Sequence, residues 1–128
     1  MLKIMRGRIN RATYWTGVGL LAVLVVVFNL IGRVHIPGEL LVLTLTIPRL
    51  HDVGRSGWWT APFVLLELAV VVVAILTLTP DEFLVAFGFF TIALLIALAW
   101  LGAVPGQASA NRFGNPPQIG VHFIATAT

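Results

Sequence analysis

The positive charges of this chain are confined to three short polar islands, which are separated by long apolar stretches with almost no charge. Seven of the eight Lys and Arg residues lie in these islands, namely Lys3, Arg6, Arg8, Arg11, Arg49, Arg55 and Arg112. Helices that cross a lipid bilayer need long uncharged apolar runs, and the cytoplasmic loops between such helices retain Lys and Arg. The pattern therefore predicts a polytopic membrane protein, and it indicates which parts of the chain lie on the cytoplasmic side.

The composition excludes several other classes of protein. The mean hydropathy of +0.99 is far above that of water-soluble domains. The chain has no cysteine, which removes disulfides, thiolate metal sites and cysteine nucleophiles. The isoelectric point is near 10.7, but the net charge is only +3 and no basic stripe is long enough to follow a nucleic-acid backbone. We therefore expect the basic residues to face anionic lipid headgroups, and we expect no nucleic acid and no cofactor.

The apolar runs predict an all-α fold, a four-helix transmembrane bundle formed by residues 1–117. The predicted helices span about residues 14–31, 37–50, 60–79 and 83–104, and residues 118–128 are left unassigned. The first run is too long for a secretory signal and lacks a small-residue cleavage site, which indicates an uncleaved helix. Pro62 is expected in the first turn of the third helix, where its missing N–H costs nothing. Residues 80–82 are interpreted as a tight acidic turn.

The second helix raises a question of topology. Residues 37–50 are about 14 in number, fewer than the roughly 17 needed to cross a bilayer without tilt, so length alone allows a re-entrant segment. If this helix crosses, the first island, the 48–57 loop and the final polar segment share one side, and the other side holds Arg33, Glu39, Asp81 and Glu82. The positive-inside bias favours that arrangement. We therefore predict a bacterial inner-membrane protein with both termini in the cytoplasm.

The three islands together resemble a known family. Residues 7–15 read Gly-Arg-x-x-Arg-x-x-Tyr-Trp, residues 49–59 read Arg-Leu-His-Asp-Val-Gly-Arg-Ser-Gly-Trp-Trp, and residues 111–114 read Asn-Arg-Phe-Gly. These motifs are similar to those of the domain-of-unknown-function 805 family of small bacterial inner-membrane proteins. The chain departs from the family pattern at Pro48, where relatives often place a second Arg, and at residues 115–117. The resemblance implies a membrane domain and no particular activity.

A candidate binding site follows from the position of the islands on one membrane face. Arginine side chains bind phosphate and carboxylate groups through two parallel hydrogen bonds. The motif residues are expected to lie near each other and to bind an anionic headgroup or an acidic segment of a partner, although topology and headgroup solvation are an alternative role for the same charges. The predicted site residues are Arg8, Arg11, Arg49, His51, Asp52, Arg55 and Asn111.

The adjacent pair His51 and Asp52 is the most obvious candidate for acid–base chemistry. Adjacent residues do not normally point at one another, and Asp52 is equally suited to accept from Arg49 or Arg55 or to cap a turn. Ser56 is the only hydroxyl nearby in the sequence. We therefore predict no catalytic residue. A metal site is not predicted either, because the third ligand, His35, would lie across the membrane.

Two strongly polar residues, Asn29 and Glu67, lie inside the predicted membrane helices, away from the polar islands. Glu67 falls roughly 12 Å below the interface at 1.5 Å per residue. An acid at that depth is a functional candidate for proton relay or cation binding. We favour a structural role for Glu67, in which it makes a hydrogen bond to Thr44 or Thr46, because a single acid makes a poor ion path. The predicted interface anchors are Trp15, Trp58, Trp59 and Trp100.

The sequence is compatible with three functions. The first is a non-catalytic accessory or scaffold protein whose cytoplasmic cluster binds anionic lipid or a partner protein. The second is a small-solute or ion transporter or channel that uses Glu67, which would need a polar path or a cavity beside that residue. The third is a membrane enzyme acting on lipid headgroups through His51 and Asp52, which would need a pocket open to the headgroup region. The sequence sets neither the oligomeric state nor the identity of any ligand.

Overall fold

The computed structural model describes residues 7–31 and 38–123 and shows an all-helical fold within those ranges. The helices are α1 (Arg11–Ile31), α2 (Gly38–Asp52), α3 (Ala61–Thr77) and α4 (Pro80–Ala103), with a 3₁₀ turn, η2 (Gly57–Thr60), before α3. No strand occurs among the described residues, where the only β-type pairing is an isolated bridge between Asn111 and Gly114. The predicted all-α class and the count of four helices agree with this structure.

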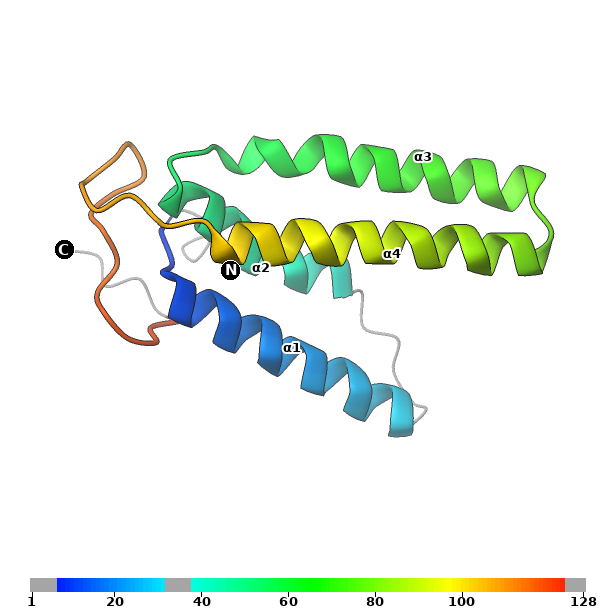
Figure 1. The fold of residues 1–128 in the computed structure, drawn as a ribbon, viewed down its shortest axis with the longest axis horizontal. Helices are drawn as coiled ribbons and strands as arrows, with labels where there is room; N and C mark the ends of the chain where they lie inside the picture. The colour runs from blue at the N-terminus through cyan, green and yellow to red at the C-terminus, as the bar shows by residue number, and fades with distance from the viewer. Residues whose placement is uncertain (1–6, 32–37, 124–128) are drawn as a thin grey trace.

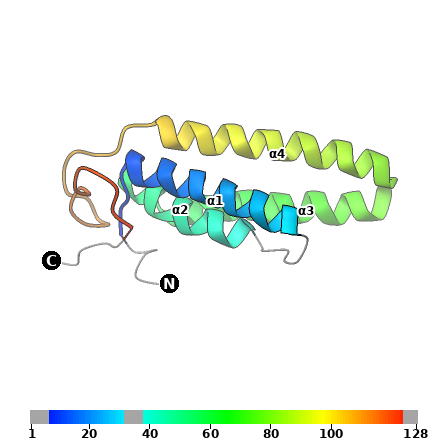
Figure 2. The same ribbon diagram turned by 90° about the horizontal axis from the view of Figure 1, so that it is seen from below.

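The four helices alternate in direction (Figure 1). Helices α1 and α3 run away from one end of the bundle, and α2 and α4 return to it, so that the described residues of all three polar islands lie at that end. We call it the motif end. The α3–α4 connection lies at the opposite end, and the view turned by 90° shows the same arrangement (Figure 2). The helices thus bring together segments that are about 40 to 100 residues apart in the sequence, as between Arg8 and Asp52 or Ser109.

Three of the helical segments are long and apolar enough to cross a membrane, namely Arg11–Phe28, Gly57–Thr77 and Pro80–Ala103. Their apolar side chains point outward, since at most 17% of each segment is buried within the protein. Helix α2 is not one of the three. Its 15 residues measure about 22 Å at 1.5 Å per residue, less than a hydrocarbon core of about 30 Å. A full crossing by α2 therefore stays a prediction.

Two helices begin earlier than expected because polar caps start them. Helix α1 begins at Arg11 rather than near Tyr14, because the side-chain oxygen of Asn10 accepts a hydrogen bond from the Thr13 N–H at 2.8 Å. Helix α4 begins at Pro80 rather than near residue 83. The Thr79 side chain and Glu82 form a capping box there, so the interpretation of residues 80–82 as a separate turn was wrong.

The other helix ends differ from the prediction by a few residues. Helix α3 ends at Thr77, two residues early, and has Pro62 in its first turn as predicted. Helix α2 continues through Pro48 to Asp52. It stops because Gly54 adopts a φ of +80° and the Arg55 N–H donates to the Leu50 carbonyl at 2.8 Å, the hydrogen-bond pattern of a Schellman cap.

The best-packed part of the bundle lies at the motif end. Ile9, Tyr14 and Leu101 are buried there, and Val18, Leu45, Leu50 and Val53 pack against them. The Tyr14 hydroxyl donates to the Leu98 carbonyl at 3.0 Å, which ties α1 to α4. The two helices approach so closely that a Cβ atom at Gly102 would lie 2.6 Å from the Trp15 ring. This packing holds the polar islands in fixed positions.

Candidate functional site

A buried group of three charged side chains, Arg8, Arg49 and Asp52, lies at the centre of the motif end; we call it the ion triad. Arg8 donates from Nε and Nη2 to Oδ1 of Asp52 at 3.1 and 3.0 Å, and Arg49 donates from Nη1 to Oδ2. The three side chains are 1%, 0% and 4% exposed, respectively. Both carboxylate oxygens are therefore occupied by guanidinium groups from the first and second islands.

The remaining guanidinium N–H groups of the triad bind main-chain carbonyls. These acceptors come from the segment before α1, from the end of α4 and from the polar segment that follows it. Arg8 donates to the carbonyls of Gln107, Ser109 (2.8 Å) and Gly114 (3.1 Å), and Arg49 donates to those of Ile9 (3.4 Å), Leu101 (3.3 Å) and Val104. Among the described residues, no buried side-chain nitrogen or oxygen lacks a hydrogen-bond partner. The triad therefore joins four separate segments of the chain.

Gly106 lets the segment after α4 cross directly over the Asp52 carboxylate. A Cβ atom at this position would lie 1.9 Å from Oδ2 of Asp52. This distance is far shorter than a van der Waals contact, so only glycine fits here. The next residue, Gln107, donates its N–H to the Asp52 carbonyl at 2.8 Å. Neither residue is among the predicted site residues, although the Pro105-Gly106 pair marks a turn in the sequence.

His51 and Asn111 are held by structural contacts beside the triad. His51 Nδ1 lies 3.1 Å from the Gly7 carbonyl, and because a carbonyl only accepts, Nδ1 must carry the hydrogen. The imidazole stacks on Phe113, with ring centroids 3.9 Å apart and planes 8° apart. Asn111 donates to the His51 carbonyl at 2.9 Å and to Oε1 of Gln107 at 2.8 Å. The second and third islands are thereby joined through their motif residues.

The protonation of His51 is expected to destabilise the folded protein. Burial lowers the pKa of His51 below 6.5, the Gly7 hydrogen bond partly opposes this, and the charge of Arg112 lowers it further. The unfolded chain therefore binds the proton more readily, so stability is full above about pH 6.5 and falls as pH decreases through the lower folded pKa. His51 lies beyond the predicted crossing segment 37–50. Measuring the unfolding temperature between about pH 8 and pH 5 checks the predicted loss of stability.

The matched control for this pH experiment is His51→Asn, which keeps a donor near the Nδ1 position and does not titrate in this range. Its unfolding temperature should depend less on pH between 6.5 and 5 than that of the wild type. Equal pH dependence of the two proteins would contradict the assignment of the effect to His51.

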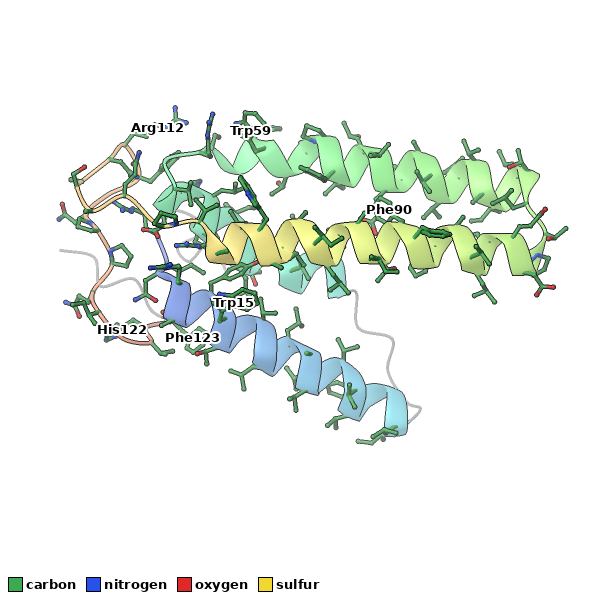
Figure 3. The ribbon with its side chains drawn as sticks, in the orientation of Figure 1. Trp15, Trp59, Phe90, Arg112, His122 and Phe123 are labelled. Carbon is green, nitrogen blue, oxygen red and sulfur yellow. The ribbon has the colours of Figure 1, made fainter. Side chains whose placement is uncertain are left out.

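Among the residues that the structure describes, the exposed cations of the motif end are Arg11, Arg55 and Arg112. The guanidinium carbon of Arg55 lies 5.4 Å from the centroid of the Trp59 ring, and that of Arg112 lies 4.7 Å from Phe113. Arg112 and Trp59 both lie near the beginning of α3 (Figure 3). The structure thus brings Arg8, Arg49, His51 and Asp52 together in the interior, with the half-buried Asn111 beside them. It leaves Arg11 and Arg55 on the surface.

The predicted intramembrane residues lie away from the motif end. Glu67 is half-buried on α3, and the Thr46 hydroxyl donates to the Val42 carbonyl of its own helix at 2.8 Å. Asn29 lies in α1, but its side chain is not described. Arg33 and His35 lie outside the described residues. The four predicted anchors have exposed rings: Trp15 (46%), Trp58 (82%), Trp59 (56%) and Trp100 (65%).

An open groove of about 310 Å³ lies between α3 and α4, away from the triad. Its lining is almost wholly apolar and comprises Ala69, Val70, Val73, Ala74, Thr77, Leu78 and Ala86. Among the described residues, no group of three or more His, Asp and Glu side chains is placed to hold a metal ion. The site at the motif end is therefore a network of charged and amide groups that bind one another, with exposed arginines at its surface.

Comparison with known proteins identifies similar chains without an assigned activity. A family model described as "Protein of unknown function (DUF805)" matches residues 34–115. The "Uncharacterized protein YiiR" of Escherichia coli K12 is 32% identical over 126 residues, which cover 88% of this chain and 85% of that protein. The protein of the same name from Escherichia coli O157:H7 matches with the same identity and coverage. No solved structure matches the chain.

Proposed function

The chain belongs to the DUF805 family of proteins of unknown function, and because the family carries no assigned activity, we propose a function from the geometry of the motif end. The proposal is a non-catalytic accessory protein of the bacterial inner membrane, with both termini in the cytoplasm. Its motif end binds anionic, phosphate-bearing lipid headgroups through Arg55 and Arg112. The ion triad has a structural part in this function, since it fixes the surface on which these two arginines lie.

The observation that carries the proposal is the difference between two pairs of motif arginines. Arg8 and Arg49 are buried and bind Asp52, whereas Arg55 and Arg112 are exposed and lie beside aromatic rings. Tryptophan rings collect at the headgroup level of a bilayer. Trp59 therefore favours a position of Arg55 at the depth of lipid phosphates, where each basic residue contributes about 1 kcal/mol.

The contacts of His51 and Asp52 support a non-catalytic role. A general acid or base must reach the proton of a substrate. Both carboxylate oxygens of Asp52 accept from arginines, and His51 is stacked on Phe113 with Nδ1 on the Gly7 carbonyl. The groove between α3 and α4 is not lined by these two side chains.

The proposal predicts that removing the two exposed arginines abolishes a preference for anionic lipid. The delipidated protein is titrated with phosphatidylglycerol and with phosphatidylcholine, and the adducts are measured by native mass spectrometry. The Arg55→Gln/Arg112→Gln variant should lose about 30-fold in its affinity for phosphatidylglycerol, since two charges contribute about 2 kcal/mol. Binding of phosphatidylcholine should not change.

The control is Lys3→Gln/Arg11→Gln, which removes the same charge from the first island. It should lose clearly less affinity than the Arg55 and Arg112 variant. An equal loss in both variants would show general charge attraction and contradict a site at Arg55 and Arg112. Retention of a co-purified protein by the wild type alone, without a lipid preference, would favour a protein partner instead.

A further inference from the structure

Residues 118–123 lie across the beginning of α1, and nothing in the family match, which ends at residue 115, accounts for them. The Asn10 side-chain amide donates to the carbonyls of Gln118 and Gly120 at 2.7 and 2.6 Å. The His122 N–H donates to the hydroxyl oxygen of the buried residue Thr13 at 2.9 Å. Figure 3 shows His122 and Phe123 beside the first turns of α1.

Asn10 holds this segment and caps α1 with the same side chain. Its oxygen accepts from the Thr13 N–H, while its NH₂ group binds the two carbonyls of the segment. The position of residues 118–122 is therefore fixed relative to the first turn of α1. That helix is one of the three that are apolar enough to cross a membrane.

The segment alternates between residues that bind α1 and apolar residues that do not. Gln118, Gly120 and His122 supply the main-chain groups that bind Asn10 and Thr13. The intervening side chains are exposed and apolar: Ile119 (101%), Val121 (46%) and Phe123 (43%). Within the described structure, these side chains are left largely uncovered.

We propose that residues 118–123 form an interfacial membrane anchor, in which Ile119, Val121 and Phe123 insert into the boundary between headgroups and acyl chains. We assign lipid as the occupant of this surface because the segment is held at the depth expected for the membrane interface. It is tied to Asn10 and Thr13, next to the exposed cation Arg11 and one turn from Trp15, the residue types found at a membrane interface. The anchor lies beside α1, whereas Arg112 and Trp59 lie near α3 (Figure 3).

The test uses the absence of native cysteine. An Ile119→Cys variant of the full chain is labelled with the environment-sensitive fluorophore NBD and reconstituted into nanodiscs. We expect a blue-shifted emission that is quenched by phospholipids brominated near the headgroup end of their acyl chains. The matched control is Asn115→Cys, an exposed position in the preceding loop, which should keep the emission of a probe in water.

A release variant tests the part played by Asn10. Asn10→Ser keeps a side-chain oxygen for the helix cap and removes the two amide donors. In the labelled Ile119→Cys background it should reduce both the blue shift and the quenching by brominated lipid, with the helical content measured by circular dichroism unchanged. If this variant does not fold, the comparison of Ile119→Cys with Asn115→Cys alone decides the question.

Two results would overturn the anchor. An Ile119 probe with the same emission as the Asn115 probe would place the segment in water. A blue-shifted probe that brominated lipids do not quench would place it against protein, such as a second copy of the chain. The Arg55→Gln/Arg112→Gln substitutions should leave the probe signal unchanged, so that the anchor and the headgroup site succeed or fail separately.

Discussion

Asp52→Asn is expected to destabilise the folded protein by about 3–5 kcal/mol, the usual cost of breaking a buried ion pair by removing one partner. The substitution keeps the size of the side chain and removes its negative charge. Arg8 and Arg49, which are 1% and 0% exposed, would then remain as two buried cations without an anion. The amide would also direct N–H groups toward guanidinium donors, where no acceptor is available.

The measurement is denaturant unfolding in detergent micelles, followed by the fluorescence of the native tryptophans. Asp81→Asn is the matched control, because it removes one exposed carboxylate from the first turn of α4, where a charge contributes at most about 1 kcal/mol. If Asp52→Asn unfolds within about 0.5 kcal/mol of the control, which is the usual range for surface substitutions, the triad does not stabilise the fold.

The contribution of the triad extends beyond its ion pairs. Buried ion pairs are often no more stabilising than apolar side chains of the same shape. A guanidinium group, however, has five N–H donors in a fixed planar geometry. Arg8 and Arg49 use these donors to fix the carbonyls of Ile9, Val104 and Ser109 relative to one another. We infer that the triad sets the arrangement of the segments at the motif end, including the one that carries Arg112.

The helices and the meeting of the islands could be predicted from the sequence. Long apolar runs with charges only at their ends leave few alternatives to antiparallel helices with the polar islands at one end. The sequence also marks the two helix caps. Thr79 followed three residues later by Glu82 is a capping-box pattern, and Asn10 is a favoured N-cap residue before α1.

The roles of the individual arginines could not be predicted in the same way. Arg8, Arg11, Arg49 and Arg55 all lie in motifs, and nothing in their spacing says which of them reach Asp52. The choice depends on the direction of each side chain from a helix end and on the close passage of Gly106. The docking of residues 118–122 on Asn10 is likewise a main-chain contact between distant segments, for which no side-chain pattern is required.

Gly106→Ala is the second substitution with a large expected effect. The added Cβ would lie 1.9 Å from Oδ2 and 2.6 Å from Cγ of Asp52, and the carboxylate cannot move aside without leaving Arg8 or Arg49. Overpacking of this kind costs about 1–3 kcal/mol, and we expect about 3 kcal/mol because the displaced group is part of the triad. Gly106 is not among the glycines with positive φ, so the cost is steric.

The control for this substitution is Gly88→Ala, in the middle of α4, where an added Cβ meets no atom within 4 Å. It should stabilise the protein by about 0.5–1 kcal/mol, because alanine is the better helix former. Both variants are compared with the wild type by the same tryptophan-monitored unfolding. Equal stability of the two variants would mean that the segment after α4 does not rest on Asp52. If Gly106→Ala and Asp52→Asn each destabilise the protein and the double variant loses less than their sum, the close passage of Gly106 and the ion triad form one coupled unit.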